Sequence, residues 1–202
     1  MICKVLDDLF DGMYLHQIEK HISEIPLYTN NIANRTTWPY GTKGSHRLLG
    51  SRLFHRESMN SIKEYSEHAK PFFEILQQIE EKLNAYFYLH EIALNVQHEG
   101  CNGTTHTDSA SSHDYTILMM TNAEWDSSQG GQFQLTTKDG DVVEEYEYIP
   151  GRVIMLPSKH PHRGLGPIGE YVYRSSVVWR VTPLDTYPVS YTHLTLPTTE
   201  AV

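Results

Sequence analysis

Residues 130–156 read GGQFQLTTKDGDVVEEYEYIPGRVIML, and three strands with their turns can be read from them. The runs Gln132 to Thr137, Val142 to Tyr148 and Arg152 to Leu156 are short, rich in β-forming residues and bounded by turn residues. Asp139-Gly140 falls between the first two runs, which is a strong hairpin signal. This stretch therefore predicts antiparallel strands joined by tight turns.

Strand patterns continue on both sides of this stretch. Leu89 to Gln97, Tyr115 to Thr121 and Tyr171 to Val181 also alternate, and glycine-rich turns separate them. Six or more short strands with regular turns favour a sandwich or jelly roll over a parallel βαβ sheet.

Residues before position 89 are predicted to be mostly helical. Apolar residues recur at helical spacing from Asp8 to Ile25, and a second helix is expected to run from Ser58 or Asn60 to about Ala85. Pro71 is expected to kink or split that second helix. The fold class is therefore predicted as α+β, with the helices packed on the strands.

A long polar loop is expected between the two helices, from Thr29 to Ser51. Trp38 and Tyr40 in this loop are candidates for a substrate lid or for ordinary aromatic packing, and Trp125 farther along has the same two readings.

The 202 residues fit one domain, because a chain of this size buries about 70% of its unfolded surface without disulfides. We expect a single domain over residues 1–182, with helical support and a lid loop in 1–88 and the β core in 89–182. Residues 183–202 are expected to be a tail, either native or left by cloning or read-through.

Charge and cysteine content exclude several classes of protein. Lys and Arg number 16 against 25 Asp and Glu, and this net charge of −9 disfavours a general nucleic-acid binder. Cys3 and Cys101 suit a reducing compartment, so we expect a cytoplasmic protein. No apolar run approaches the roughly 20 residues of a membrane span, and Asp7, Asp8 and Asp11 do not fit a signal peptide.

A metal-binding pattern starts at His106-Thr107-Asp108. On extended backbone, residues two apart point to the same face, so His106 and Asp108 can converge on one point. His160 and His162 follow a later strand, and either can supply a third ligand. Two imidazoles and one carboxylate form the facial triad that holds Fe(II) with open positions.

An arginine is expected to point into the core from the last strand. Alternation places Arg174 and Ser176 on one face of this strand, and Tyr173 and Trp179 on the other. A buried arginine is costly unless it meets an anion, and its planar guanidinium matches a carboxylate. By contrast, Arg180 is expected to be a surface charge.

These residues resemble the Fe(II)/2-oxoglutarate-dependent dioxygenase superfamily, and above all its prolyl 4-hydroxylase-like branch. That branch usually has a lysine where Arg174 stands. The resemblance covers about residues 90–181, and its elements are His106-Thr107-Asp108, the strand 115–122, Gly130-Gly131-Gln132-Phe133, Pro150-Gly151 before the strand 152–156, His162-Arg163-Gly164 with Pro167, and Arg174-Ser175-Ser176.

The resemblance implies a double-stranded β-helix, or jelly-roll, core with the N-terminal helices packed on its major sheet. It implies Fe(II) on His106, Asp108 and His162, the last preferred over His160 because Gly164 and Pro167 follow it. It also implies O2 and 2-oxoglutarate, with ascorbate as an optional reductant. The residues implied to contact 2-oxoglutarate are Arg174, Ser176 and Tyr115, and the candidates for orienting the imidazoles are Thr107 and Asn122.

The reaction implied is hydroxylation of a C–H bond, with 2-oxoglutarate decarboxylated to succinate. A peptidyl proline or another protein side chain is one substrate class; free amino acids, small metabolites and nucleobases are others. Two alternatives stay open: a cupin-type metalloenzyme that does not use 2-oxoglutarate, and an inactive jelly-roll binding module. The partner is therefore a protein, peptide or small-molecule substrate, with no general nucleic-acid or membrane binding, and the oligomeric state is open.

Overall fold

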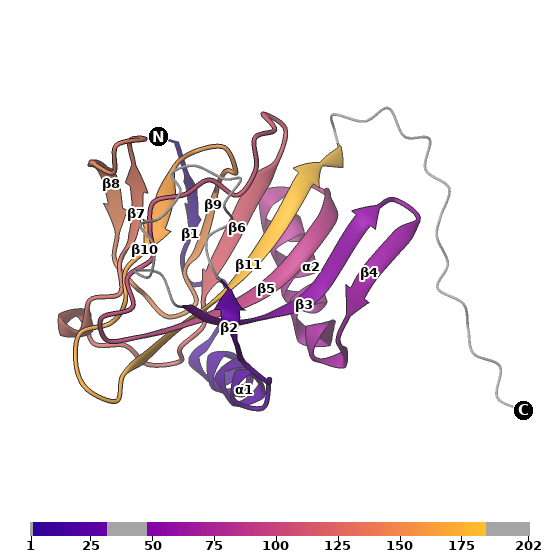
Figure 1. Ribbon diagram of the computed structural model, residues 1–202. Coiled ribbons are helices and arrows are strands. Elements are labelled where there is room, and N and C mark those ends of the chain that lie inside the picture. The colour runs from indigo at the N-terminus through magenta and orange to yellow at the C-terminus, as the bar shows by residue number, and fades with distance from the viewer. Residues whose placement is uncertain (1, 32–47, 185–202) are drawn as a thin grey trace, which may run out of the picture.

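The computed structural model describes residues 2–31 and 48–184, and in that part the fold is mostly antiparallel β-sheet with two α-helices (Figure 1). The helices are α1 (Gly12–Ser23) and α2 (Lys70–Leu83), with the 3-10 turns η1 (Glu67–Ala69) and η2 (Ser127–Gln129). The strands are β1 (Lys4–Leu6), β2 (Tyr28–Asn31), β3 (Leu48–Ser58), β4 (Ser61–Tyr65), β5 (Phe87–His98), β6 (Tyr115–Met120), β7 (Phe133–Thr136), β8 (Val142–Tyr146), β9 (Val153–Pro157), β10 (His162–Gly164) and β11 (Tyr173–Pro183).

The strands form two sheets within the described residues. The main sheet has eight strands in the order β1-β9-β6-β11-β5-β3-β2, with β4 added on β3, and the small sheet has the order β10-β7-β8. In Figure 1 the small sheet stands at one end, beside β1 and β9. The predicted jelly-roll class is confirmed, with a long main sheet and a short second sheet.

Two hydrophobic cores lie on opposite faces of the main sheet. One core packs α1 and α2 against it through residues such as Ile18, Phe72 and Trp179. The other lies between the two sheets and includes Leu118, Met120, Phe133, Leu135 and Ile154. A strand with apolar residues on both faces must lie in the middle of the molecule, and β11 is such a strand.

Local signals explain where both helices begin and end. The Asp11 side chain accepts a hydrogen bond from the Tyr14 amide at 2.7 Å and caps α1. Pro71 lies in the first turn of α2, where its missing N–H costs nothing. Asn84 ends α2 in the left-handed conformation with φ 51°. No helix in the described ranges is long and apolar enough to cross a membrane.

The predicted second helix starts too early. Residues 61–65 form strand β4, paired with β3, and the helix begins only at Lys70. Ile62 and Tyr65 share helical spacing, but both are more than half exposed on the hairpin. Pairing with β3 provides backbone hydrogen bonds that spacing along the sequence does not show. Pro71 therefore begins the helix and does not kink it.

The predicted loop over residues 29–51 is also partly wrong. Its ends form β2 and the start of β3, while residues 32–47, including Trp38 and Tyr40, lie outside the described residues. The six predicted strands after residue 88 are confirmed to within about two residues. β1 and the short β10 were not predicted. Most of the proposed tail lies outside the described residues, and its first residue, Pro183, still belongs to β11.

Candidate functional site

His106 and His162 face each other across a short antiparallel bridge at the edge of the small sheet. The amide of His106 donates to the carbonyl of His162 at 3.0 Å, and the amide of His162 donates back at 2.9 Å. The amide of Asp108 donates to the carbonyl of Ser158 at 2.9 Å. Backbone pairing therefore brings together two segments that are distant in the sequence.

The two imidazole rings converge on the Asp108 carboxylate. Nε2 of His106 lies 3.5 Å from Oδ1 of Asp108, and Nε2 of His162 lies 3.4 Å from Oδ2. Nδ1 of His106 lies 2.8 Å from the carbonyl oxygen of Thr104. Nδ1 of His162 lies 2.8 Å from that of His160. Because a carbonyl only accepts, Nδ1 of each ring is the donor, which leaves Nε2 beside Asp108 as the nitrogen available to a metal ion.

Hydroxyl groups hold the Asp108 carboxylate from the other side. Oγ1 of Thr116 donates to Oδ2 of Asp108 at 2.6 Å and lies 2.9 Å from Oγ of Ser158. Burial opposes the charged form of Asp108, but the two imidazoles outweigh it and hold the pKa of this carboxyl well below its usual range. Burial likewise opposes the charged form of His106, yet Asp108 raises the pKa of that ring. The cluster therefore favours positive charge at its centre, which a divalent metal ion would supply.

The donor set fits non-haem Fe(II). The ligand atoms of His106, Asp108 and His162 all lie within 4.8 Å of one another. Ligand atoms about 2.1 Å from one ion and at right angles lie about 3 Å apart, and the two distances from imidazole nitrogen to carboxylate oxygen, 3.5 and 3.4 Å, are near this value. Two histidines and one carboxylate on one side of an ion leave its other positions open. His160 contributes its carbonyl, not its ring, so the preference for His162 agrees with the geometry.

Arg174 is buried on β11 with one nitrogen unpaired. Its Nε donates to the carbonyl of Gly131 at 2.8 Å. Its Nη1 donates to Oε1 of Gln97 at 2.8 Å and to Oγ of Ser176 at 3.3 Å. Its Nη2 is buried without a hydrogen-bond partner. Burial lowers the pKa of Arg174, but arginine starts so high that it remains a cation. A buried cation with an unpaired donor fits a carboxylate ligand.

The guanidinium of Arg174 packs against aromatic rings. The Tyr148 ring lies 5.3 Å from the guanidinium carbon of Arg174, and the Trp125 ring lies 4.3 Å from the Tyr148 ring. A side chain at Gly131, which has φ +78°, would approach Trp125 to 2.9 Å and Arg174 to 3.4 Å. Glycine is therefore required at this position. Trp125 packs beside Tyr148 and Arg174, so of its two predicted roles the structure supports aromatic packing.

Gly164 lies between the Arg174 guanidinium and the metal-binding cluster. A Cβ at Gly164 would lie 3.3 Å from both terminal nitrogens of Arg174, so the guanidinium lies directly against this residue. His162 and Gly164 are two residues apart on β10, which places them on the same face about 7 Å apart. This spacing is on the scale of a five-carbon dicarboxylate that binds the metal at one end and Arg174 at the other.

Tyr115 does not join this site. It packs against the helix-side core, on the face of β6 opposite Thr116, so the structure does not bring it to the metal-binding cluster. Strand alternation alone does not show which face of β6 turns toward the metal-binding cluster. In the structure, the hydroxyl that reaches this cluster is that of Thr116. Asn122 instead accepts hydrogen bonds from Tyr148 at 2.6 Å and from the Ser175 amide at 2.8 Å, which ties β6 to β11. The backbone carbonyls of Thr104 and His160 hold the imidazole rings.

Arg180, expected to be a surface charge, has a side chain that is 34% exposed and lies partly inside the molecule. Its Nη2 lies 2.6 Å from Oε2 of Glu91, which is 7% exposed, and its Nη1 donates to the carbonyl of Asp108 at 3.4 Å. Gln97, Thr116 and Arg180 were all missed as contributors. The signal for Gln97 was a polar residue at the end of an alternating strand, but its partner Arg174 follows only from strand register.

Comparison with known proteins gives matches among solved structures only; no family model and no curated protein matches the chain. A 2OG-Fe(II) oxygenase family oxidoreductase from Burkholderia pseudomallei aligns with TM-score 0.64 and 16% identity, over 90% of this chain and 85% of that one. The chain has the fold of the 2OG-Fe(II) oxygenases.

Two prolyl hydroxylase structures align with the same oxygenase fold. The prolyl-4-hydroxylase from Pseudomonas putida aligns with TM-score 0.57 and 15% identity, over 90% of this chain and 92% of that one. A prolyl hydroxylase from Trichoplax adhaerens, in complex with a hypoxia inducible factor peptide fragment, aligns with TM-score 0.61 and 11% identity, over 95% and 88%. The oxygenase fold thus includes the jelly-roll core and most of the N-terminal part of this chain.

Proposed function

We propose that this protein is an Fe(II)- and 2-oxoglutarate-dependent dioxygenase that hydroxylates a C–H bond. One observation carries the proposal: the His106, Asp108 and His162 cluster shares a face with Gly164, and the unpaired guanidinium nitrogen of buried Arg174 lies against that glycine. A cupin that uses only a metal does not require a buried cation close to its metal ligands. A binding module without catalysis does not require the three-ligand cluster.

The chain's own residues bind and orient the reacting groups. When bound, Fe(II) supplies the oxidising chemistry: O2 and 2-oxoglutarate give succinate and CO2, and the second oxygen atom enters the substrate C–H bond. His106, Asp108 and His162 would hold the ion, and Thr116 keeps the Asp108 carboxylate turned toward it. Arg174, assisted by Ser176, would bind the far carboxylate of 2-oxoglutarate.

The finer expectations remain proposals. The prolyl hydroxylases among the structural neighbours support a peptidyl proline or another protein side chain as one substrate class. Ascorbate as a reductant and a cytoplasmic location rest on the sequence resemblance and on cysteine content.

Succinate release tests the proposed reaction. The purified protein with Fe(II) under air is expected to convert 2-oxoglutarate to succinate slowly without substrate, and anaerobic addition of Fe(II) and 2-oxoglutarate is expected to give a visible absorption band. Oxygen consumption that does not depend on 2-oxoglutarate would point to the cupin alternative. A protein that binds neither Fe(II) nor 2-oxoglutarate would support the binding module.

Gln97→Leu is expected to weaken 2-oxoglutarate binding about tenfold or more, because one hydrogen bond to a charged group contributes about 1.5–3 kcal/mol. Gln97 accepts from Arg174, and its amide donates to the carbonyls of Cys101 at 2.8 Å and Gly164 at 3.0 Å, so it holds the guanidinium in place. Titration of the absorption band with 2-oxoglutarate measures the affinity. Gln134→Leu removes an equally buried glutamine on β7 and is the control. Equal affinities in the two variants would contradict the role of Gln97.

A further inference from the structure

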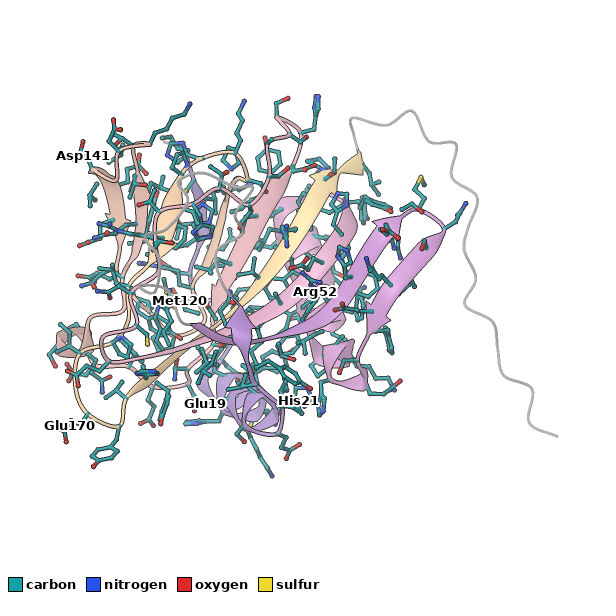
Figure 2. All side chains as sticks on the ribbon, viewed as in Figure 1. Glu19, His21, Arg52, Met120, Asp141 and Glu170 are labelled. Atoms are coloured by element: carbon teal, nitrogen blue, oxygen red, sulfur yellow. The ribbon has the colours of Figure 1, made fainter. Side chains whose placement is uncertain are left out.

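A pocket of about 330 Å³ opens on the main sheet over strands β3 and β5. Its volume lies within the range of about 300–1,000 Å³ that is usual for small-molecule sites. Figure 2 shows Arg52 on this part of the sheet. The residues that line the pocket are Tyr28, Gly50, Ser51, Arg52, Glu64, Glu91 and Ala93.

The pocket shares a sheet face with the metal-binding cluster. Glu91 on β5 pairs with Arg180 on β11, and Arg180 pairs with Thr116 on β6. Paired residues point to the same face, and Thr116 contacts Asp108 there. Two strand spacings of about 4.8 Å put the backbone of Glu91 roughly 10 Å from that of Thr116. Arg52 on β3 and Glu64 on β4 lie one and two strands beyond Glu91, so a ligand held by them must be long and extended to reach the metal.

The ion pairs of the pocket differ in strength. Oε2 of Glu91 lies 2.6 Å from Arg180 and is almost completely buried, so its charge is already balanced. Arg52 is held loosely, at 3.4 Å from Glu64 and 3.5 Å from Glu91. The side chains of Arg52 and Glu64 are 45% and 43% exposed, and an exposed pair of this kind contributes little to stability. A ligand can exchange its own charges for this pair at small cost.

The charged side chains at the pocket determine which kind of ligand it can bind. Arg52 and Arg180 face Glu64 and Glu91, and Nδ1 of His55 also lies 3.4 Å from Glu91, so both signs of charge are present and a lone carboxylate or a lone ammonium group matches only one of them. A group with both charges matches both, because its carboxylate matches the guanidinium of Arg52 and its ammonium matches Glu64. Free α-amino acids carry these two charges on one carbon.

We propose that this pocket binds the amino and carboxylate groups of a free amino acid, whose side chain extends past Arg180 to the metal. This substrate assignment rests on the proposed dioxygenase function. In the balanced reaction, the amino acid's C–H bond, O2 and 2-oxoglutarate give a hydroxylated amino acid, succinate and CO2. Arg52 and Glu64 are the residues that determine specificity for the charged end.

A substrate panel tests the pocket directly. Each of the common free L-amino acids, its N-acetyl form, its methyl ester and capped peptides that contain it are added to protein with Fe(II) and 2-oxoglutarate. At least one free amino acid with a long side chain is expected to stimulate succinate release, and blocking either charged group is expected to reduce the stimulation tenfold or more. Equal or stronger stimulation by a capped peptide would overturn the proposal.

Variants of the pocket give an independent readout. Arg52→Gln and Glu64→Gln are each expected to raise the KM for the amino acid about tenfold or more, with the 2-oxoglutarate affinity unchanged. The control is Lys63→Gln with Glu57→Gln, which removes a more exposed ion pair of the same β3–β4 hairpin. The same KM in the pocket variants and in the control would overturn the assignment.

The two proposals fail in different ways. If Fe(II) and 2-oxoglutarate give the absorption band and slow succinate release, but no free amino acid stimulates it or binds in calorimetric titration, the substrate assignment is wrong and the dioxygenase function stands. If the band and the succinate release are both absent, the dioxygenase function itself fails.

Discussion

His162→Ala is expected to lower the affinity of the protein for Fe(II) at least ~100-fold and to abolish succinate release, since even the loss of groups that only orient metal ligands costs 10–100-fold. The His162 ring is 4% exposed, and its Nε2 is aimed at Asp108. Without this ring, only His106 and Asp108 remain as ligands, and β10 contributes none. Competition between the protein and a metal indicator, with Co(II) as the probe ion, measures the affinity.

His160→Ala is the matched control for this experiment. It removes a neighbouring imidazole but keeps the backbone carbonyl that binds Nδ1 of His162. Metal affinity and turnover are expected to stay within about twofold of the parent protein, as is usual for a residue outside such a network. Asp108→Asn removes the charge that joins both rings and is expected to match His162→Ala. Unchanged turnover in both His162→Ala and Asp108→Asn would show that the ligands lie elsewhere.

Arg174→Gln is expected to weaken 2-oxoglutarate binding by about 100-fold, because charge-assisted hydrogen bonds contribute about 1.5–3 kcal/mol each. The substitution removes the cation and the unpaired Nη2 that would bind the far carboxylate of 2-oxoglutarate. Affinity for Co(II) is expected to be unchanged, because the hydrogen bonds of Arg174 go to Gly131, Gln97 and Ser176 and not to the three ligand side chains.

A second co-substrate separates the binding role of Arg174 from a structural one. 2-Oxobutyrate has the same metal-binding end as 2-oxoglutarate but lacks the far carboxylate, so its affinity is expected to be equal in Arg174→Gln and in the parent. Arg174→Lys keeps the charge and is expected to restore part of the 2-oxoglutarate affinity. A parallel loss of affinity for both oxo acids would mean that the arginine only supports the fold.

The sequence was a better guide to the strands than to the helices. The strand β11 alternates Arg174 and Ser176 with Val177 and Trp179, and the two faces are buried as predicted. Residues 58–69 were assigned to a helix because Ile62 and Tyr65 have helical spacing, whereas pairing with β3 makes β4 a strand. Apolar spacing reports only which residues are apolar, and short exposed strands depend on partners that are distant in the sequence.

The sequence predicted the three side chains that the structure brings together, and it missed the residues that hold them in place. His106, Asp108 and His162 follow a recognisable order, and so does Arg174. Gln97 and Thr116 were given no role in the site, and on the strand that holds Thr116 only Tyr115 was singled out. Their functions depend on which face of β5 and β6 turns toward the small sheet, and a single sequence leaves that open.

The sequence by itself determined the chemistry that is available: two imidazoles and a carboxylate for a metal ion, and an inward arginine for an anion. Residue type, spacing and strand alternation are local properties, and they suffice for this. Only the tertiary structure decided that Nη2 of Arg174 is unpaired against Gly164, and that Arg180 and Glu91 join a charged pocket to the metal-binding cluster. Those relations depend on strand register and sheet packing, which arise from contacts between distant segments.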